Sequence, residues 1–221
     1  MALKDLPIEQ RRFYHSLIFP SLFVLILWLF KIYELIEDRN LSNFGIYPRQ
    51  FDGLQGILLS PLVHYDFNHL LSNTISLYFL MIGIFYFFNL FAYKIFFVSY
   101  FVPNIIVWII GRSAYHIGCS GIIYSFAFFL FFSGIVSKNN NFLALSLLVT
   151  FLYGSMIWGL FPLINQISWE SHISGALTGI ILAYYFKPKI VEIYKIEDVE
   201  MTEEDENLEN GYDDYNQKVN E

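Results

Sequence analysis

The sequence predicts an all-α fold: a polytopic membrane protein whose six transmembrane helices form a bundle. Composition indicates the membrane, because 56% of the 221 residues are hydrophobic, 20% are aromatic and only 15% are charged. Six apolar stretches also approach the roughly 20 residues that a helix needs to cross a bilayer. These stretches cover residues 16–35, 69–88, 90–110, 119–136, 142–163 and 171–186.

The first stretch follows a short polar segment, residues 1–15. It is too long for the core of a signal peptide and no A-x-A-like cleavage site follows it, so we expect a retained anchor. The next connection, residues 36–68, includes the apolar run 53–59, which is too short to span. We expect this run to lie at the membrane interface or to pack sideways against the helices. The membrane-embedded domain then continues to residue 190.

Charge separates this domain from the C-terminal tail, residues 191–221. Residues 192–221 hold 12 of the 20 acidic residues against 2 lysines, whereas residues 1–191 carry 8 acidic and 11 basic residues, so the negative net charge of the chain comes from the tail. We expect the tail to be disordered in the cytoplasm. Outside it, 7 basic residues fall on the side of the N-terminus and 4 on the other, so both termini are predicted to be cytoplasmic. The seven are Lys4, Arg11, Arg12, Lys94, Lys138, Lys187 and Lys189.

Several function classes lack support. No basic patch with interleaved aromatics exists outside the apolar spans, so nucleic-acid binding is not expected. Cys119 is the single cysteine, which excludes an internal disulfide and favours a small buried hydrophobic side chain. The sequence lacks H-E-x-x-H, and no metal or other cofactor is expected. No feature specifies an oligomeric state.

Four polar residues are predicted to lie at one depth near the outer face. The second, fourth and sixth spans all run from outside to inside, and each carries polar residues near its outer end. These residues are His69 and Asn73 on the second span, Ser120 on the fourth and His172 on the sixth. Because polar side chains in lipid are costly unless they face the bundle or a water-filled cavity, their agreement in depth indicates a shared site.

Helical spacing brings these residues closer together. His69 and Asn73 are four residues apart, on one face of a helix. Gly175 and Gly179 lie three and seven residues after His172, and such a stripe of small residues lets another helix approach closely. We therefore expect the fourth and sixth spans to touch, with Ser120 opposite His172.

This arrangement would suit nucleophilic catalysis. A serine hydroxyl needs a base to take its proton, and histidine is the usual base near neutral pH, so Ser120 and His172 would suffice as a dyad. No acid stands out as a third member, because Glu170 lies two residues from His172 and should point elsewhere. Asn73, His69 and the Ser120 backbone N–H could stabilise an oxyanion. Each residue taken singly also fits a packing role.

The motifs resemble, in order and spacing, those of rhomboid intramembrane serine proteases over about residues 17–187. They are His64, His69 and Asn73 at the second span; Gly118-Cys119-Ser120-Gly121 with Tyr124 at the fourth; and His172, Gly175 and Gly179 at the sixth. The resemblance implies that Ser120 is the nucleophile and His172 the general base. It further implies that His69 and Asn73 flank the oxyanion, that His172 rests on the Tyr124 ring and that His64 lies near the site.

The resemblance also implies a serine endopeptidase that hydrolyses peptide bonds in or beside transmembrane segments of other membrane proteins. Many rhomboids carry a Trp-Arg pair in the first outer loop, which here has no tryptophan. Residues 45–49 resemble a bacterial branch without that pair, which implies the bacterial inner membrane. Sideways movement of the fifth span is the gating hypothesis that comes with the family.

Two other functions compete with proteolysis. The first is a catalytically inactive rhomboid-like protein that binds membrane clients, although such relatives usually lack the serine or the histidine. The second is a transporter or channel with a histidine relay. It is disfavoured because the polar residues cluster at one end of the bundle and do not line a path across it.

Overall fold

A computed structural model of the chain describes residues 6–137, 140–163, 167–187 and 189. The described secondary structure is helical, which confirms the all-α class. The elements are α1 Ile8–Ile36, η2 Leu41–Phe44, η3 Phe51–Gly53, α2 Gly56–Leu59, η4 Ser60–Leu62, α3 Phe67–Phe87, α4 Ala92–Ile110, α5 Ser120–Ser137, α6 Asn140–Tyr153 and η5 Gly154–Leu160. A last helix covers residues 169–187. The predicted tail lies outside the described residues.

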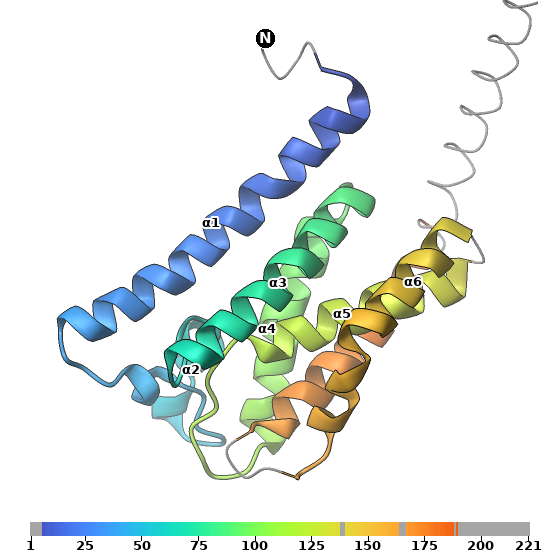
Figure 1. Ribbon diagram of the computed structural model, residues 1–221. Helices are drawn as coiled ribbons and strands as arrows, with labels where there is room; N and C mark the ends of the chain where they lie inside the picture. The colour runs from blue at the N-terminus through green and yellow to red at the C-terminus, as the bar shows by residue number, and fades with distance from the viewer. Residues whose placement is uncertain (1–5, 138–139, 164–166, 188, 190–221) are drawn as a thin grey trace, which may run out of the picture.

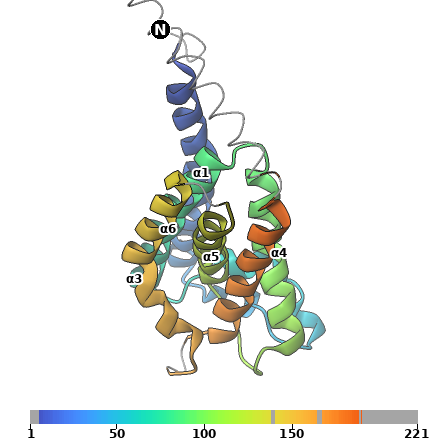
Figure 2. The ribbon, with the colours of Figure 1, turned by 90° about the vertical axis from the view of Figure 1, so that its right-hand side faces the viewer.

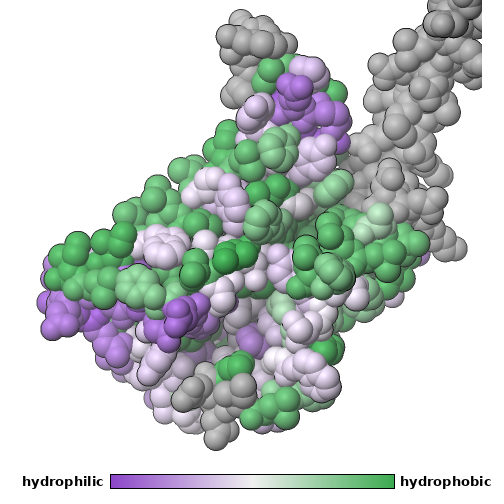
Figure 3. Space-filling model, viewed as in Figure 1, coloured by the Kyte–Doolittle hydropathy of each residue, from purple (hydrophilic) through white to green (hydrophobic). Residues whose placement is uncertain are grey.

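The long helices form a bundle of membrane-spanning character (Figure 1). Five segments are long and apolar enough to cross a membrane, namely α1, α3, α4, α5 and Leu143–Leu160. The sixth predicted stretch lies within the helix over 169–187. Figure 3 shows a hydrophobic surface along α1 with hydrophilic residues at both of its ends, the pattern expected of a helix in lipid.

Helix α5 lies at the centre of the bundle, with α4, α6 and the 169–187 helix around it (Figure 2). Its spanning window is 67% buried, whereas that of Leu143–Leu160 is only 11% buried. A helix that is apolar on all sides is stable in the middle of a bundle because each face finds an apolar partner. Phe126 and Phe129 fill the core from this helix. The first residue of α5 therefore has a well-fixed position.

The 169–187 helix packs directly on the backbone of α5. A Cβ added at Gly175 would overlap the Gly121 carbonyl oxygen, and one at Gly179 would overlap that of Ser125. At Gly121 an added Cβ would come within 2.7 Å of Ser171 Oγ. The predicted stripe of small residues thus lies where these two helices touch.

Two predicted boundaries differ from the structure. Helix α1 begins at Ile8, eight residues before the predicted first span, because the polar start of the chain is also helical. The fifth span does not continue as one α-helix to residue 163. It changes to 3-10 geometry at Gly154, where tertiary hydrogen bonds to backbone carbonyls replace the α-helical pattern.

The connection between α1 and α3 docks onto the end of the bundle. Ile46 and His116 exchange two backbone hydrogen bonds of 2.9 Å. The predicted apolar run 53–59 packs sideways, which is one of its two predicted placements: Tyr100 donates a hydrogen bond to the Leu58 carbonyl, and Asn104 Nδ2 donates one of 3.1 Å to that of Ile57. The connection is thereby fixed against α4.

Replacing Gly179 with alanine should destabilise the bundle, because the new methyl group would collide with the α5 backbone. Overpacking of this kind costs about 1–3 kcal/mol of unfolding free energy. We expect a lower thermal unfolding midpoint in detergent, measured by circular dichroism. Gly83→Ala is the matched control, since its Cβ would meet only Leu130 Cδ1 at 3.6 Å. Equal midpoints for the two variants would contradict this account of the helix contact.

Candidate active site

Ser120 and His172 lie within hydrogen-bond distance of each other. Ser120 begins α5, and His172 lies in the first turn of the 169–187 helix. The distance between Ser120 Oγ and His172 Nε2 is 2.9 Å. The turn before Ser120 requires glycine, because Gly118 has φ of +99° and its N–H donates a 2.9 Å hydrogen bond to the Ser60 carbonyl.

The second nitrogen of His172 fixes which tautomer the ring adopts. Nδ1 lies 2.8 Å from the Gly159 carbonyl oxygen in η5. Because a carbonyl oxygen only accepts hydrogen bonds, Nδ1 carries the proton. In the neutral ring Nε2 then has a free lone pair and accepts the hydrogen bond from the Ser120 hydroxyl. This arrangement can remove a proton from Ser120.

The Tyr124 ring stacks against the face of the His172 ring. The two rings are stacked, with centroids 4.1 Å apart and an interplanar angle of 12°. The Tyr124 hydroxyl donates a 2.6 Å hydrogen bond to the Met156 carbonyl, which also belongs to η5. Two backbone carbonyls of one short segment thus hold both members of the stacked pair.

His69 and Asn73, both on α3, lie next to the Gly118 turn. Asn73 Nδ2 is 3.2 Å from His69 Nε2. A Cβ added at Gly118 would lie 2.9 Å from His69 Cε1 and 3.5 Å from Asn73 Nδ2, so both side chains reach the backbone two residues before Ser120. Asp66 caps α3 by accepting a 2.7 Å hydrogen bond from the His69 backbone N–H.

His64 is buried behind this turn and does not contact the dyad. Its Nε2 lies 3.5 Å from both the backbone nitrogen and Sγ of Cys119, and its ring packs edge-on against His69. Burial lowers the pKa of His64 to about 3, and the neighbouring His69 and Lys31 charges act in the same direction. Neutral His64 therefore accepts the hydrogen bond from the residue next to Ser120.

Lys31, one of the four basic residues that the charge distribution assigns to the outer side, is a further residue of the site region. It is 8% exposed. Its Nζ donates hydrogen bonds to Glu34 Oε2 at 2.7 Å and to the carbonyls of His64 and Tyr65 at 3.0 and 3.2 Å. It thus ties α1 to the chain just before α3. Its position inside an apolar run could have indicated this role, because a cation in such a run must find hydrogen-bond acceptors within the protein.

A second missed contact joins the two segments that lead into Ser120 and His172. Glu170 is 4% exposed. Its Oε1 lies 3.7 Å from Arg112 Nε and accepts a 3.3 Å hydrogen bond from the Arg112 backbone N–H. Glu170 thus points to Arg112 and not to His172, as predicted from its spacing. Among the described residues, no carboxylate hydrogen-bonds either nitrogen of His172.

An apolar cavity adjoins the stacked rings. It has a volume of about 390 Å³ and is bounded by α5, α6 and η5. Phe128 and Met156 line it, and both also contact Tyr124, through ring stacking and through the Met156 carbonyl. The cavity could therefore receive apolar side chains beside Tyr124, on the side where Phe128 and Met156 contact it. The described part of the chain contains no cluster of three potential metal ligands.

Comparison with known proteins identifies relatives of this chain. A family model described as Rhomboid domain matches residues 52–189. An uncharacterized protein of Mycobacterium tuberculosis is 32% identical over 180 residues, which cover 73% of this chain and 71% of that protein. An uncharacterized protein of Mycobacterium leprae is 29% identical over 180 residues, covering 73% and 68%. The matched family region contains every residue of the site described above except Lys31 and Glu34.

The protonation of His64 should make the protein less stable in acid. Its pKa is lowered from 6.5 to about 3 on folding, so between these values the unfolded chain binds more protons than the folded one. Stability should therefore fall as pH decreases through 6.5, by up to about 1.4 kcal/mol per pH unit. The measurement is the thermal unfolding midpoint in detergent from pH 7 to pH 5.

His64→Gln should show a smaller loss of midpoint over this range than the wild type, because the neutral amide does not titrate. The exposed His15→Gln is the control and should keep the wild-type dependence. An unchanged slope in His64→Gln would show that the buried imidazole is not responsible.

Proposed function

The chain belongs to the rhomboid family, and from this premise we propose that it is an intramembrane serine endopeptidase with Ser120 and His172 as its catalytic dyad. The observation that carries the proposal is the 2.9 Å hydrogen bond between Ser120 Oγ and His172 Nε2, together with the Gly159 carbonyl on Nδ1. This geometry leaves a basic nitrogen next to a hydroxyl. The reaction class it suits is acyl transfer to serine.

In the first step Ser120 Oγ attacks the carbonyl carbon of the scissile peptide bond while its proton passes to His172 Nε2. The resulting imidazolium is stabilised without a carboxylate. Its Nδ1–H remains hydrogen-bonded to the Gly159 carbonyl, and its positive charge rests on the face of the Tyr124 ring. These two contacts take the place of the third member of a catalytic triad.

The negative charge that develops on the substrate oxygen needs hydrogen-bond donors. Asn73 Nδ2 and the backbone N–H of Ser120 are the proposed donors. His69 Nε2 accepts the 3.2 Å hydrogen bond from Asn73 Nδ2 and is proposed to orient this amide beside the Gly118 turn. His172 then returns its proton to the leaving amine, the C–N bond breaks and an acyl-enzyme forms on Ser120. A water molecule, deprotonated by the same histidine, hydrolyses this ester and restores the hydroxyl.

The proposed substrates are transmembrane segments of other proteins. A peptide carbonyl in a helix is already hydrogen-bonded, so the substrate must unwind locally at the scissile bond. The apolar cavity beside Tyr124 offers room for a substrate side chain. The fifth span is the proposed gate. Its window is only 11% buried, and Phe151 and Trp158 are 87% and 66% exposed, so most of the surface of this span faces away from the bundle.

Removing either member of the dyad tests the proposed function. Ser120→Ala and His172→Ala should each cut a helix-destabilised single-span substrate in liposomes at least about 10³-fold more slowly than the wild type. Ser133→Ala on the same helix and the exposed His15→Ala are matched controls and should keep wild-type rates. Ser133 Oγ is buried without a hydrogen-bond partner among the described residues.

Fluorophosphonate labelling separates the alternatives if cleavage is absent. Labelling of the wild type but not of Ser120→Ala would show an active serine and a wrong substrate. A wild type that neither cleaves nor reacts with the probe would indicate the inactive client-binding protein. Cleavage by all variants would place the activity elsewhere and overturn the proposal.

Substituting Gly159 tests the contact between η5 and His172. A Cβ at this position would overlap the Tyr124 hydroxyl and lie 3.1 Å from His172 Nδ1, so Gly159→Ala should push η5 away from the base. We expect kcat to fall about 10–100-fold, since misplacing a catalytic group by about 1 Å has costs of this order. KM should change little because the added methyl group does not line the cavity.

Gly154→Ala is the matched control in the same short segment, since its Cβ would meet only Thr150 Cγ2 at 3.9 Å. It should keep the wild-type kcat, and because Gly154 lines the apolar cavity, any effect of its methyl group should fall on KM. If the two alanine variants have the same kcat, the hydrogen bond from His172 to η5 does not contribute to catalysis.

A further inference from the structure

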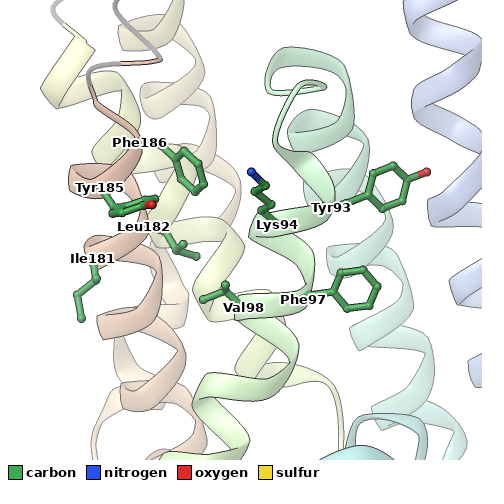
Figure 4. Close-up of a pocket in the computed structure, with 8 residues that line it drawn as sticks. All are labelled: Tyr93, Lys94, Phe97, Val98, Ile181, Leu182, Tyr185 and Phe186. Atoms are coloured by element: carbon green, nitrogen blue, oxygen red, sulfur yellow. The ribbon is translucent and has the colours of Figure 1, made fainter.

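A second apolar hollow lies far from the dyad, between α4 and the 169–187 helix. Its volume is about 550 Å³. Figure 4 shows Val98 and Leu182 pointing into the space between the two helices, with Phe186 and the side chain of Lys94 near one end of it. Phe186 follows His172 by 14 positions in the same helix, about 21 Å along its axis. The hollow is therefore separate from the candidate active site.

Two lysines lie at the Phe186 end of this hollow, and a third is next to Phe186 in the chain. Lys94 lines it, Lys187 follows Phe186 directly, and Lys189 Nζ lies 5.9 Å from the centroid of the Phe186 ring. All three are exposed. Within the described residues none of them forms an ion pair, and no acidic residue lines the hollow. The charge at its mouth is thus uncompensated by the described part of the chain.

We propose that this hollow, with its three lysines, is a binding site for an anionic phospholipid. The acyl chain would lie against Val98, Leu182 and Phe186, and the phosphate would contact the lysines. The apolar walls explain why the ligand is a lipid and not a free phosphate, which would gain nothing from them. Tyr93 and Tyr185, which also border the hollow, suit the interface between acyl chains and headgroups, where tyrosine is enriched.

The lysines supply the selectivity between lipids. Each lysine near a membrane surface contributes roughly a fivefold preference for anionic over zwitterionic lipid. Lys94 and Lys189 at one end of the hollow, with Lys187 adjacent in the chain, would give a site that distinguishes headgroups. This proposal is independent of proteolysis.

The test is lipid binding to the full-length protein, delipidated in a neutral detergent. Native mass spectrometry would count bound phosphatidylglycerol and phosphatidylcholine with identical acyl chains. The wild type should bind phosphatidylglycerol preferentially. Lys94→Gln should lower this preference about fivefold. Arg39→Gln removes one exposed positive charge at the other end of the bundle and is the matched control that should keep the preference.

Val98→Phe tests the apolar part of the site, because the larger ring would fill the hollow while the lysines remain. It should reduce the binding of phosphatidylglycerol severalfold, with an unchanged circular dichroism spectrum. Equal binding of both lipids by the wild type would overturn the proposal, as would equal preferences in Lys94→Gln and Arg39→Gln. Loss of preference in Lys94→Gln with full binding by Val98→Phe would overturn the hollow as the place of the acyl chain.

Discussion

The contact between α5 and the 169–187 helix determines the rest of the site. In lipid, apolar surfaces gain little by leaving the solvent, so helices associate through close packing and hydrogen bonds. Gly175 and Gly179 let one backbone rest on the other without intervening side chains. Because the two helices are this close, a serine on one and a histidine on the other meet through a single hydrogen bond. Any larger side chain at these glycines would separate them.

Polar groups stabilise this end of the bundle from two directions. Lys31 ties α1 to the residues that lead into α3, and Glu170 ties the start of the 169–187 helix to Arg112. Lys31 donates to a carboxylate and two backbone carbonyls, and Glu170 Oε1 accepts from the backbone N–H of Arg112 and lies beside its guanidinium, so each buried side chain has polar partners of opposite character. The two contacts hold the opposite flanks of the Ser120 region, so the site depends on charges that themselves perform no chemistry.

The fold class and the residues that meet at the site could be predicted from the sequence. The spacing of the glycines and the position of each polar residue along its apolar stretch can both be read from it directly. The sequence did not predict the role of η5. A backbone carbonyl has no side chain of its own, and Gly159 gives no sign in the sequence that its carbonyl faces His172. Contacts such as that of Arg112 with Glu170, far apart in the chain, also follow only from the folded arrangement. The early start of α1 was missed because hydropathy does not register a polar helical turn.

The η5 segment connects the proposed gate with the support of His172. It belongs to the span proposed as the gate, and its Gly159 and Met156 carbonyls also hold the base and the ring beneath it. If η5 moved with the proposed gate, the imidazole would lose the carbonyl that fixes its tautomer. Substrate entry and proton transfer from Ser120 to His172 would then not occur at the same time. A membrane protein that merely diffuses into the opening would leave again before the base is restored, and only one that stays until η5 returns would be cut.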